Sequence, residues 1–344
     1  MEPELDTFLT TVYCVVDELY ATHFAPLKPT RRGAKPVLTD SEVLTLGLLA
    51  QSHRSRSERA FLASAERPLR PYFPHWPTQS TFNRRLRDLA GVLAHLVPLV
   101  AARTAALLGS SAYEVLDGVP VPLARRCRGQ RHRCFGPEAA MGRGGSDKDW
   151  FFGQKLLLAV DAHGSITGAV SGPADTEEHW LADALFRWRR APLAGPPTAA
   201  ELDPVLGPAH RDAGHRTGPT GPILLRGAVG APADAVALGD QGYRGQNWAG
   251  HWRRDYGARM LTKAAYAQTE QAARRWLTGL RQVVETVNGW LEDRLGLHFP
   301  RARTAWGLQT RLAAKLAAFN LAVYFNSLCA KHGPFTAPPC WASA

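Results

Sequence analysis

Apolar positions recur with helical spacing through the first hundred residues. Between residues 6 and 20 an apolar stripe falls at i, i+3 and i+4 spacing, which predicts an amphipathic helix. Residues 38–49 begin with a polar cap and acidic residues before a run rich in valine and leucine, so a second helix is expected there. A short helix from residue 57, broken by four prolines, precedes another helix at 78–89. We predict that residues 1–105 form an all-α region.

The helix predicted at 78–89 has a basic outward side. Phe82 and Leu86 fall on its inward face, whereas Asn83, Arg84 and Arg87 can face outward. A short helix, a turn and a capped basic helix make the outline of a helix-turn-helix, whose second helix reads the major groove of DNA. The alternative left open is a helical region whose basic face is simply solvated.

Beyond residue 110 the pattern changes to alternating strands and helices. Short apolar runs predict strands at 113–116, 155–160, 166–170, 234–238 and 258–262. Helical spacing predicts helices at 176–190, 246–254, 268–294 and 308–330. This order is expected of a ribonuclease-H-like mixed sheet flanked by helices, an α/β fold. We place this domain at 106–331, with a loop insertion rich in proline and glycine at 191–222 and a tail at 332–344.

Two acidic residues follow apolar runs directly. Asp117 comes after the first predicted strand and Asp240 after the fourth. If those strands are neighbours, both carboxylates lie at one edge of the sheet, where open α/β folds bind ligands. Close carboxylates repel each other unless a cation lies between them, and Mg²⁺ prefers oxygen ligands. A third carboxylate is expected from the late amphipathic helix, on which Glu285 shares a face with Arg281.

At these residues the chain resembles the DDE transposases of bacterial insertion sequences. The resemblance covers most of the chain, and the order and separation of its motifs carry it. The motifs are Leu38-Thr-Asp-Ser-Glu-Val-Leu, Phe82-Asn-Arg-Arg-Leu, Asp117-Gly-Val-Pro-Val-Pro, Phe152-Gly-Gln-Lys, Gly239-Asp-Gln-Gly-Tyr-Arg, and Arg281 with Val284, Glu285 and Thr286. Some branches of the family carry a lysine seven residues after the glutamate, where this chain has Glu292.

The resemblance implies that Asp117, Asp240 and Glu285 are a catalytic triad that binds two Mg²⁺ ions, with Mn²⁺ as a substitute. One ion would activate water or a DNA 3′-hydroxyl, and the other would stabilise the leaving 3′-oxygen. The enzyme would then be a DNA endonuclease and strand transferase that cuts the terminal inverted repeats of its mobile element and joins them to target DNA. Because transposases pair two DNA ends, a homodimer in the DNA complex is implied as well.

The charge balance agrees with a nucleic-acid partner. The 344 residues carry 41 Lys and Arg against 30 Asp and Glu, a formal charge of +11. Six arginines lie between residues 125 and 143 against one acid, so this stretch is expected to hold DNA phosphates beside the site. A disordered basic loop is the alternative. The phosphate-binding residues predicted from these motifs are Arg125, Arg126, Arg128, Lys155, Arg244 and Arg281.

Apolar runs, the amino terminus and the cysteines bear on the cellular location of the protein. No stretch reaches the roughly 18 apolar residues that a membrane helix needs, and the acidic amino terminus is unlike a signal peptide. The five scattered cysteines do not predict a disulfide framework. We therefore expect a cytoplasmic, nucleoid-associated protein without a membrane partner.

Two further functions stay open at this point. One is a DNA-binding protein derived from a transposase and lacking catalysis, which the presence of all three acids disfavours. The other is a ribonuclease-H-like nuclease with other substrates, which the helix-turn-helix-like region disfavours.

Overall fold

The computed structural model describes residues 5–28, 36–53, 57–125, 135–144, 149–190, 224–230, 235–243, 246–262 and 271–329. The predicted insertion at 191–222 and the tail at 332–344 lie outside the described residues, as do residues 126–134 of the arginine-rich stretch.

The amino-terminal region is helical, as predicted. Its helices are α1 (Leu5–His23), α2 (Asp40–Ser52), α3 (Glu58–Leu69), α4 (Gln79–Asp88) and α5 (Ala90–Leu108), with the short 3₁₀ turn η1 (Ala25–Leu27) after α1. The cap expected near residue 39 is present, because Thr39 and Glu42 form a reciprocal capping box at the start of α2. The prediction that prolines break α3 was wrong at Pro68, which lies in the last turn of that helix.

The carboxyl-terminal part contains one mixed sheet. Its strands are β1 (Tyr113–Arg125), β2 (Ala140–Gly144), β3 (Asp149–Asp161), β4 (Ile166–Pro173), β5 (Val236–Gly239) and β6 (Arg259–Thr262). β3 pairs with β1 along one edge and with both β2 and β4 along the other, in every case antiparallel. β1, β5 and β6 then pair in parallel. β2 was not predicted, because it lies within the arginine-rich stretch.

β1 is longer than the sequence predicted. The prediction ended it at residue 116, with Asp117 at its carboxyl end, whereas the strand continues through Asp117 to Arg125. Its pairing with β3 runs along this whole length, and Asp117 lies opposite Leu158. The prolines at 120 and 122 are tolerated because β5 pairs with β1 only at residues 113–115, so no strand pairs with the other edge of β1 there.

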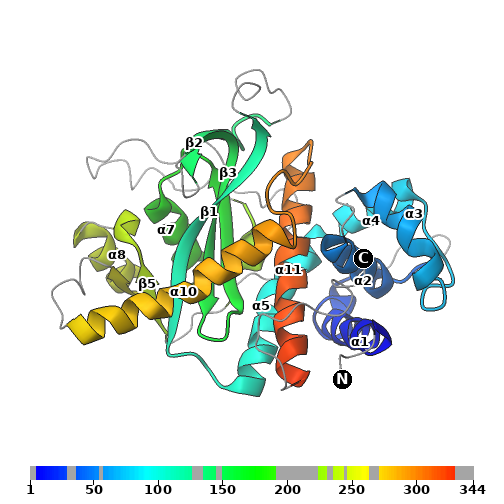
Figure 1. The fold of residues 1–344 in the computed structure, drawn as a ribbon, viewed down its shortest axis with the longest axis horizontal. Helices are drawn as coiled ribbons and strands as arrows, with labels where there is room; N and C mark the ends of the chain where they lie inside the picture. Colours follow the sequence, from blue (N-terminus) through cyan, green and yellow to red (C-terminus); the bar gives the residue numbers. More distant parts are fainter. Residues whose placement is uncertain are drawn as a thin grey trace.

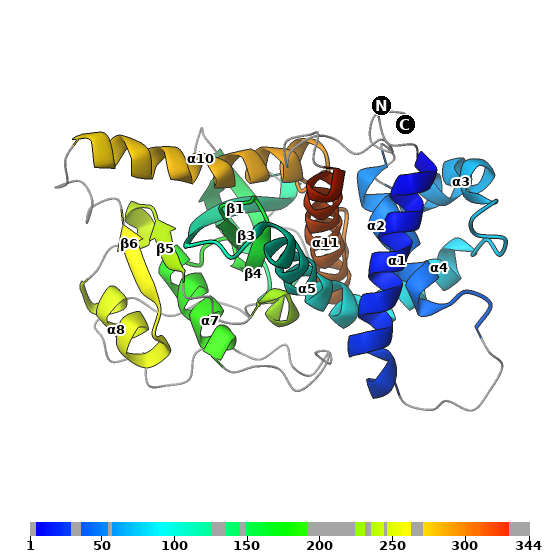
Figure 2. The same ribbon diagram turned by 90° about the horizontal axis from the view of Figure 1, so that it is seen from below.

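Helices cover both faces of the sheet. α7 (Glu178–Arg190) and α8 (Gln246–Tyr256) lie on one side, and α10 (Gln271–Asp293) crosses the opposite side (Figure 2). α11 (Ala305–Cys329) and α5 lie between the sheet and helices α1 to α4 (Figure 1). The sheet therefore divides the apolar interior in two. Leu116 and Leu157 belong to the smaller cluster with α7 and α8.

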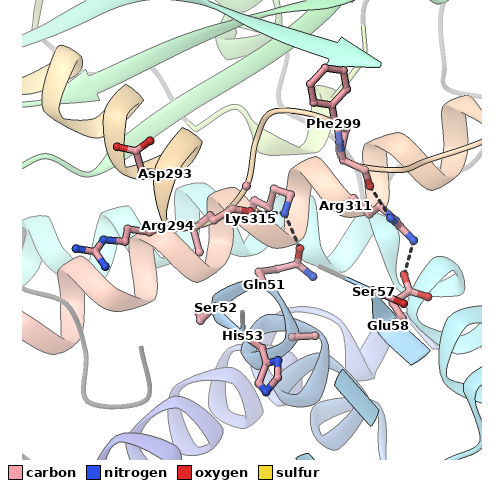
Figure 3. Close-up of a pocket in the computed structure, with 14 residues that line it drawn as sticks. Gln51, Ser52, His53, Ser57, Glu58, Asp293, Arg294, Phe299, Arg311 and Lys315 are labelled. Carbon is pink, nitrogen blue, oxygen red and sulfur yellow. Dashed lines mark hydrogen bonds and ion pairs between the residues drawn. The ribbon is translucent and has the colours of Figure 1, made fainter. Parts of the chain in front are cut away.

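The larger apolar cluster joins the two predicted domains. It runs without interruption from α1 through α5 and α11 to Val115 and Val119 on β1. Polar contacts reinforce this junction (Figure 3): Arg311 on α11 donates to Glu58 on α3 at 3.0 Å, and Lys315 donates to Gln51 on α2 at 3.2 Å. The amino-terminal helices thus share one apolar core with the domain predicted at 106–331.

Helices α5 and α11 are long and apolar enough to cross a membrane by length and composition alone. The expectation that no stretch reaches the length of a membrane helix was therefore wrong by length and composition, since α5 continues through Pro98 to Leu108. Within the apolar window of each helix, 50% of α5 and 78% of α11 is buried inside the protein. Core helices of this kind satisfy the same test.

One buried amide links three elements of this core. Asn320 on α11 is fully buried, and its Oδ1 accepts a hydrogen bond from the Ile166 amide at 2.9 Å. Its Nδ2 donates to the carbonyls of Ile166 and Val97, at 2.8 and 2.9 Å. Asn320 therefore satisfies backbone groups at the start of β4 and in α5 at once.

We predict that Asn320→Ala destabilises the protein by roughly 2–4 kcal/mol, since it leaves buried backbone groups of Ile166 and Val97 without a partner. Urea unfolding of the full chain measures this loss. Ser327→Ala on the same helix is the control, because its hydroxyl bonds only the carbonyl one turn earlier and its loss is expected to cost little. Equal stability of the two variants would contradict the role given to Asn320.

Candidate functional site

The parallel pairing of β1 with β5 brings Asp117 and Asp240 together. Val115 lies opposite Leu238 in the register, so Asp117 and Asp240 are each two residues further along. β5 ends at Gly239, and Asp240 follows directly. The sequence prediction that the two strands are neighbours is confirmed, although Asp117 lies within its strand and not at its end.

α10 supplies two side chains to the same place. The Arg281 Nη1 donates to Asp240 Oδ1 at 3.3 Å, and the Asn288 Nδ2 donates to Asp117 Oδ2 at 2.8 Å. Residues 281 and 288 are seven apart and so lie on one face of the helix, two turns from each other. Val284 and Val287 on the neighbouring face are fully buried and hold α10 against the sheet.

Glu178, which the sequence prediction missed, also lies at this site. It is the first residue of α7. A Cβ at position 118 would stand 2.9 Å from Glu178 Oε1, and one at position 242 would stand 2.7 Å from Oε2. Both positions are glycines, so the backbone just after each of the two aspartates leaves room for the Glu178 carboxylate. An acid in a first helical turn is common, so its sequence position alone did not mark it.

A buried ion pair sets the position of α7. Arg189, near the other end of that helix, donates two hydrogen bonds to Glu114 on β1, and both side chains are buried. Thr167 on β4 donates to the same carboxylate at 2.9 Å. These partners hold the pKa of Glu114 below its usual value despite burial. With Arg189 fixed beside Glu114, the start of α7 is fixed beside Gly118, four residues along β1.

The charges at the site are only partly compensated. Burial, followed by the nearby Glu178 carboxylate, raises the pKa of Asp117 to about 6. Burial and the charge of Asp240 raise the pKa of Glu178, against the opposing charges of Lys155 and Arg281. Tyr243 is almost fully buried beside these groups, and its pKa is raised well above its usual value by burial, then by Glu178 and Asp117. A bound cation would relieve this excess of negative charge.

Glu285, the predicted third acid, lies on α10 one turn after Arg281. Its side chain is exposed, and it makes no hydrogen bond or ion pair with another residue in the described part of the chain. Arg281 and Asn288 lie closer than Glu285 to the buried stripe of the helix, which is why they meet the aspartates. The structure therefore brings Arg281 to the predicted site but leaves Glu285 at its outer margin.

The other predicted phosphate-binding residues divide into two groups. Lys155 lies at the site, where its Nζ donates to the Thr176 carbonyl at 3.0 Å and its charge acts on Glu178. The side chain of Arg125, at the end of β1, lies outside the described residues, as do Arg126, Arg128 and Arg244.

On α4 the three predicted DNA-reading residues differ from one another. Arg84 and Arg87 are exposed. Asn83 is half-buried, donates to Glu58 on α3 and accepts from Arg87. Asn83 therefore connects α3 to α4 instead of extending freely from the helix.

Oxygen donors are present at the site, and they are the ligands that Mg²⁺ prefers. Among the described residues, however, no group of three His, Cys, Asp or Glu side chains is arranged to hold a metal ion. Two polar cavities of about 230 and 540 Å³ lie near α3, α4 and α11, and neither is lined by Asp117, Asp240 or Glu178.

We predict that Asp117→Asn stabilises the metal-free protein at pH 7 to 8. A folded-state pKa near 6, against 3.8 for the ordinary group, means that the native state binds the proton more tightly. The contribution of Asp117 to the stability of the wild type is then highest below about pH 4 and falls as the pH rises through 6. A rise of about two units corresponds to about 3 kcal/mol in all.

Thermal unfolding in EDTA between pH 4 and 8 tests this. The Asn variant should unfold at a higher temperature than the wild type at pH 8, and the difference should shrink toward pH 4. The predicted direction would be contradicted if the gain in unfolding temperature of the Asn variant over the wild type were smaller at pH 8 than at pH 4.

Searches against protein-family models, curated proteins and solved structures find no match to this chain. The functional conclusion therefore depends on the side chains at the end of β5 and on the fold that positions them.

Proposed function

We propose that this protein is a DDE-type DNA transposase of an insertion sequence. It would cut the terminal inverted repeats of a mobile element and join them to target DNA, with Mg²⁺ as cofactor. The observation that carries the proposal is the parallel pairing of β1 with β5, which puts Asp117, within β1, close to Asp240, directly after β5, with Arg281 from a late helix bonded to Asp240.

The fold supports this proposal. Four antiparallel strands, of which β2 is short, a helix, a strand, a helix, a strand and late helices follow one another in the chain. This is the order expected of a ribonuclease-H-like domain, and the pairing is antiparallel in the first four strands and parallel in the last two. β2 is an addition to that order. α3 and α4, with a basic exposed side on α4, are consistent with a helix-turn-helix.

The donor chemistry of the site suits a hard cation. Asp117 and Asp240 would hold it, with a third carboxylate from Glu285, as the resemblance implies, or from Glu178. When bound, Mg²⁺ would stabilise negative charge on the phosphate and activate the attacking hydroxyl. Asn288 orients one oxygen of Asp117, which leaves Oδ1 directed away from that hydrogen bond. Arg281 neutralises part of the charge of Asp240 and can bind a phosphate oxygen beside it.

The partner class follows from the same proposal. Duplex DNA would contact Arg84 and Arg87 on α4 and the basic residues near the site, and two copies of the chain would pair two DNA ends. A nucleoid-associated location in the cytoplasm would go with this activity. A transposase-derived DNA-binding protein without catalysis and a ribonuclease-H-like nuclease are the alternatives.

Asp117→Asn and Asp240→Asn should each abolish Mg²⁺-dependent nicking of DNA that flanks the gene, because each removes a carboxylate but no DNA-reading group. Binding of the same DNA should stay close to wild type. Asp255→Asn, an exposed acid on α8, is the control and should nick normally. Cleavage above roughly a tenth of wild type in both variants would overturn the catalytic assignment.

The identity of the third acid is decided by a matched comparison. If Glu285 moves to the aspartates when DNA and metal bind, Glu285→Gln lowers nicking by several orders of magnitude. If Glu178 is the third acid, Glu178→Gln has this effect. We expect at least one of the two, and Glu177→Gln, an exposed neighbour of Glu178, should behave as wild type. Normal nicking by both variants would exclude a third carboxylate on either helix.

A further inference from the structure

A basic groove runs along α4 away from the candidate active site. It encloses about 540 Å³ and is lined from α3, α4, the start of α11 and the segment 301–304 that precedes α11. The last of these segments comes from the carboxyl-terminal half of the chain, more than 200 residues after α4. The tertiary structure thus places a second segment beside the helix that the sequence marked for DNA reading.

The groove carries uncompensated positive charge. Its lining includes four arginines and one acid, Glu58, which accepts hydrogen bonds from Arg311 and Asn83. Once Glu58 is paired with Arg311, the remaining arginines have no carboxylate partner among the described residues. These are Arg87, Arg301 and Arg303, and all three are exposed.

The segment 299–304 is held in place by the elements around it. The Phe299 amide donates to the Pro122 carbonyl of β1 at 3.0 Å, and Arg311 donates to the Pro300 carbonyl. Figure 3 shows Arg311 reaching both this backbone and Glu58. At the other end of the segment, the Trp306 Nε1 donates to the Arg87 carbonyl of α4 at 3.1 Å. Arg301 and Arg303 are therefore fixed relative to both α4 and β1.

The neutral lining suits phosphate groups too. Gln79 and Ser80 at the start of α4, and Thr304 opposite them, place amide and hydroxyl donors among the arginines. Arginine, serine, threonine and glutamine side chains are among the donors that contact DNA phosphates, and such contacts position a protein on the duplex without reading its sequence.

We propose that Arg301 and Arg303 bind backbone phosphates of the duplex whose bases α4 contacts, so that the segment 301–304 forms the second wall of one DNA-binding groove. This inference rests on the proposed function. Because the segment is bonded to β1 at Pro122, five residues after Asp117, the groove also ties DNA bound at α4 to the strand that carries the candidate catalytic acid.

The test is a fluorescence-anisotropy titration of the full chain with a labelled random-sequence DNA duplex at several salt concentrations. The double variant Arg301→Ala/Arg303→Ala should bind on the order of tenfold more weakly, and its salt slope should fall by about two, one for each lost phosphate contact. Arg253→Ala/Arg254→Ala, which removes the same charge from the exposed side of α8, should keep both the affinity and the slope. Arg301→Lys/Arg303→Lys, which keeps the charge, should retain most of the binding.

Arg301 has a left-handed backbone, with φ 58°, whereas Arg303 does not, so the single variant Arg303→Ala keeps the test valid if the double variant unfolds. If the variants that lack these arginines keep the wild-type affinity and salt slope, this inference is overturned and the proposed function is not. An equal loss of affinity in the α8 control variant would also overturn this inference. Absence of duplex binding by the wild-type chain would overturn the proposed function as well.

Discussion

Three residues of parallel pairing between β1 and β5 hold the candidate site together. Only residues 113–115 of β1 pair with β5, yet this short register puts Asp117 and Asp240 side by side. β5 itself has four residues and takes its other neighbour, β6, from a segment further along the chain. Since Arg281 and Asn288 then bond to the two aspartates, the placement of α10 depends on the same pairing.

The buried carboxylates near the two ends of α7 differ in how well nearby cations compensate their charge. At Glu114 a carboxylate is buried against Arg189 and Thr167, and its pKa is lowered. Near Gly118 the carboxylates of Asp117 and Glu178 are buried with less compensation, and their pKa values are raised. The first arrangement stabilises the fold and fixes the helix. The second lowers the stability of the fold as long as no cation compensates the two carboxylates.

The helical region and the sheet form one continuous structure around α11. That helix packs against α5, and Asn320 bonds backbone groups of both α5 and β4. The ion pair between Glu58 and Arg311 then fixes α3, and through Asn83 also α4, relative to the carboxyl-terminal part. Under the proposed function, this junction would let the position of DNA on α4 determine which part of the DNA reaches the strand carrying Asp117.

The sequence by itself predicted most of the helices and strands, although not β2, because apolar periodicity and caps such as Thr39 with Glu42 are local properties. It also indicated that Asp117 and Asp240 lie together with Arg281 nearby, since positions two residues beyond a paired couple on neighbouring parallel strands lie side by side. It ended β1 too early, because the partner strand β3 and the free edge at the prolines appear only in the assembled sheet. Only the tertiary structure brought Glu178 between two glycines, and Arg301 and Arg303 beside α4. These placements depend on contacts between distant segments, for which a periodic pattern carries no signal.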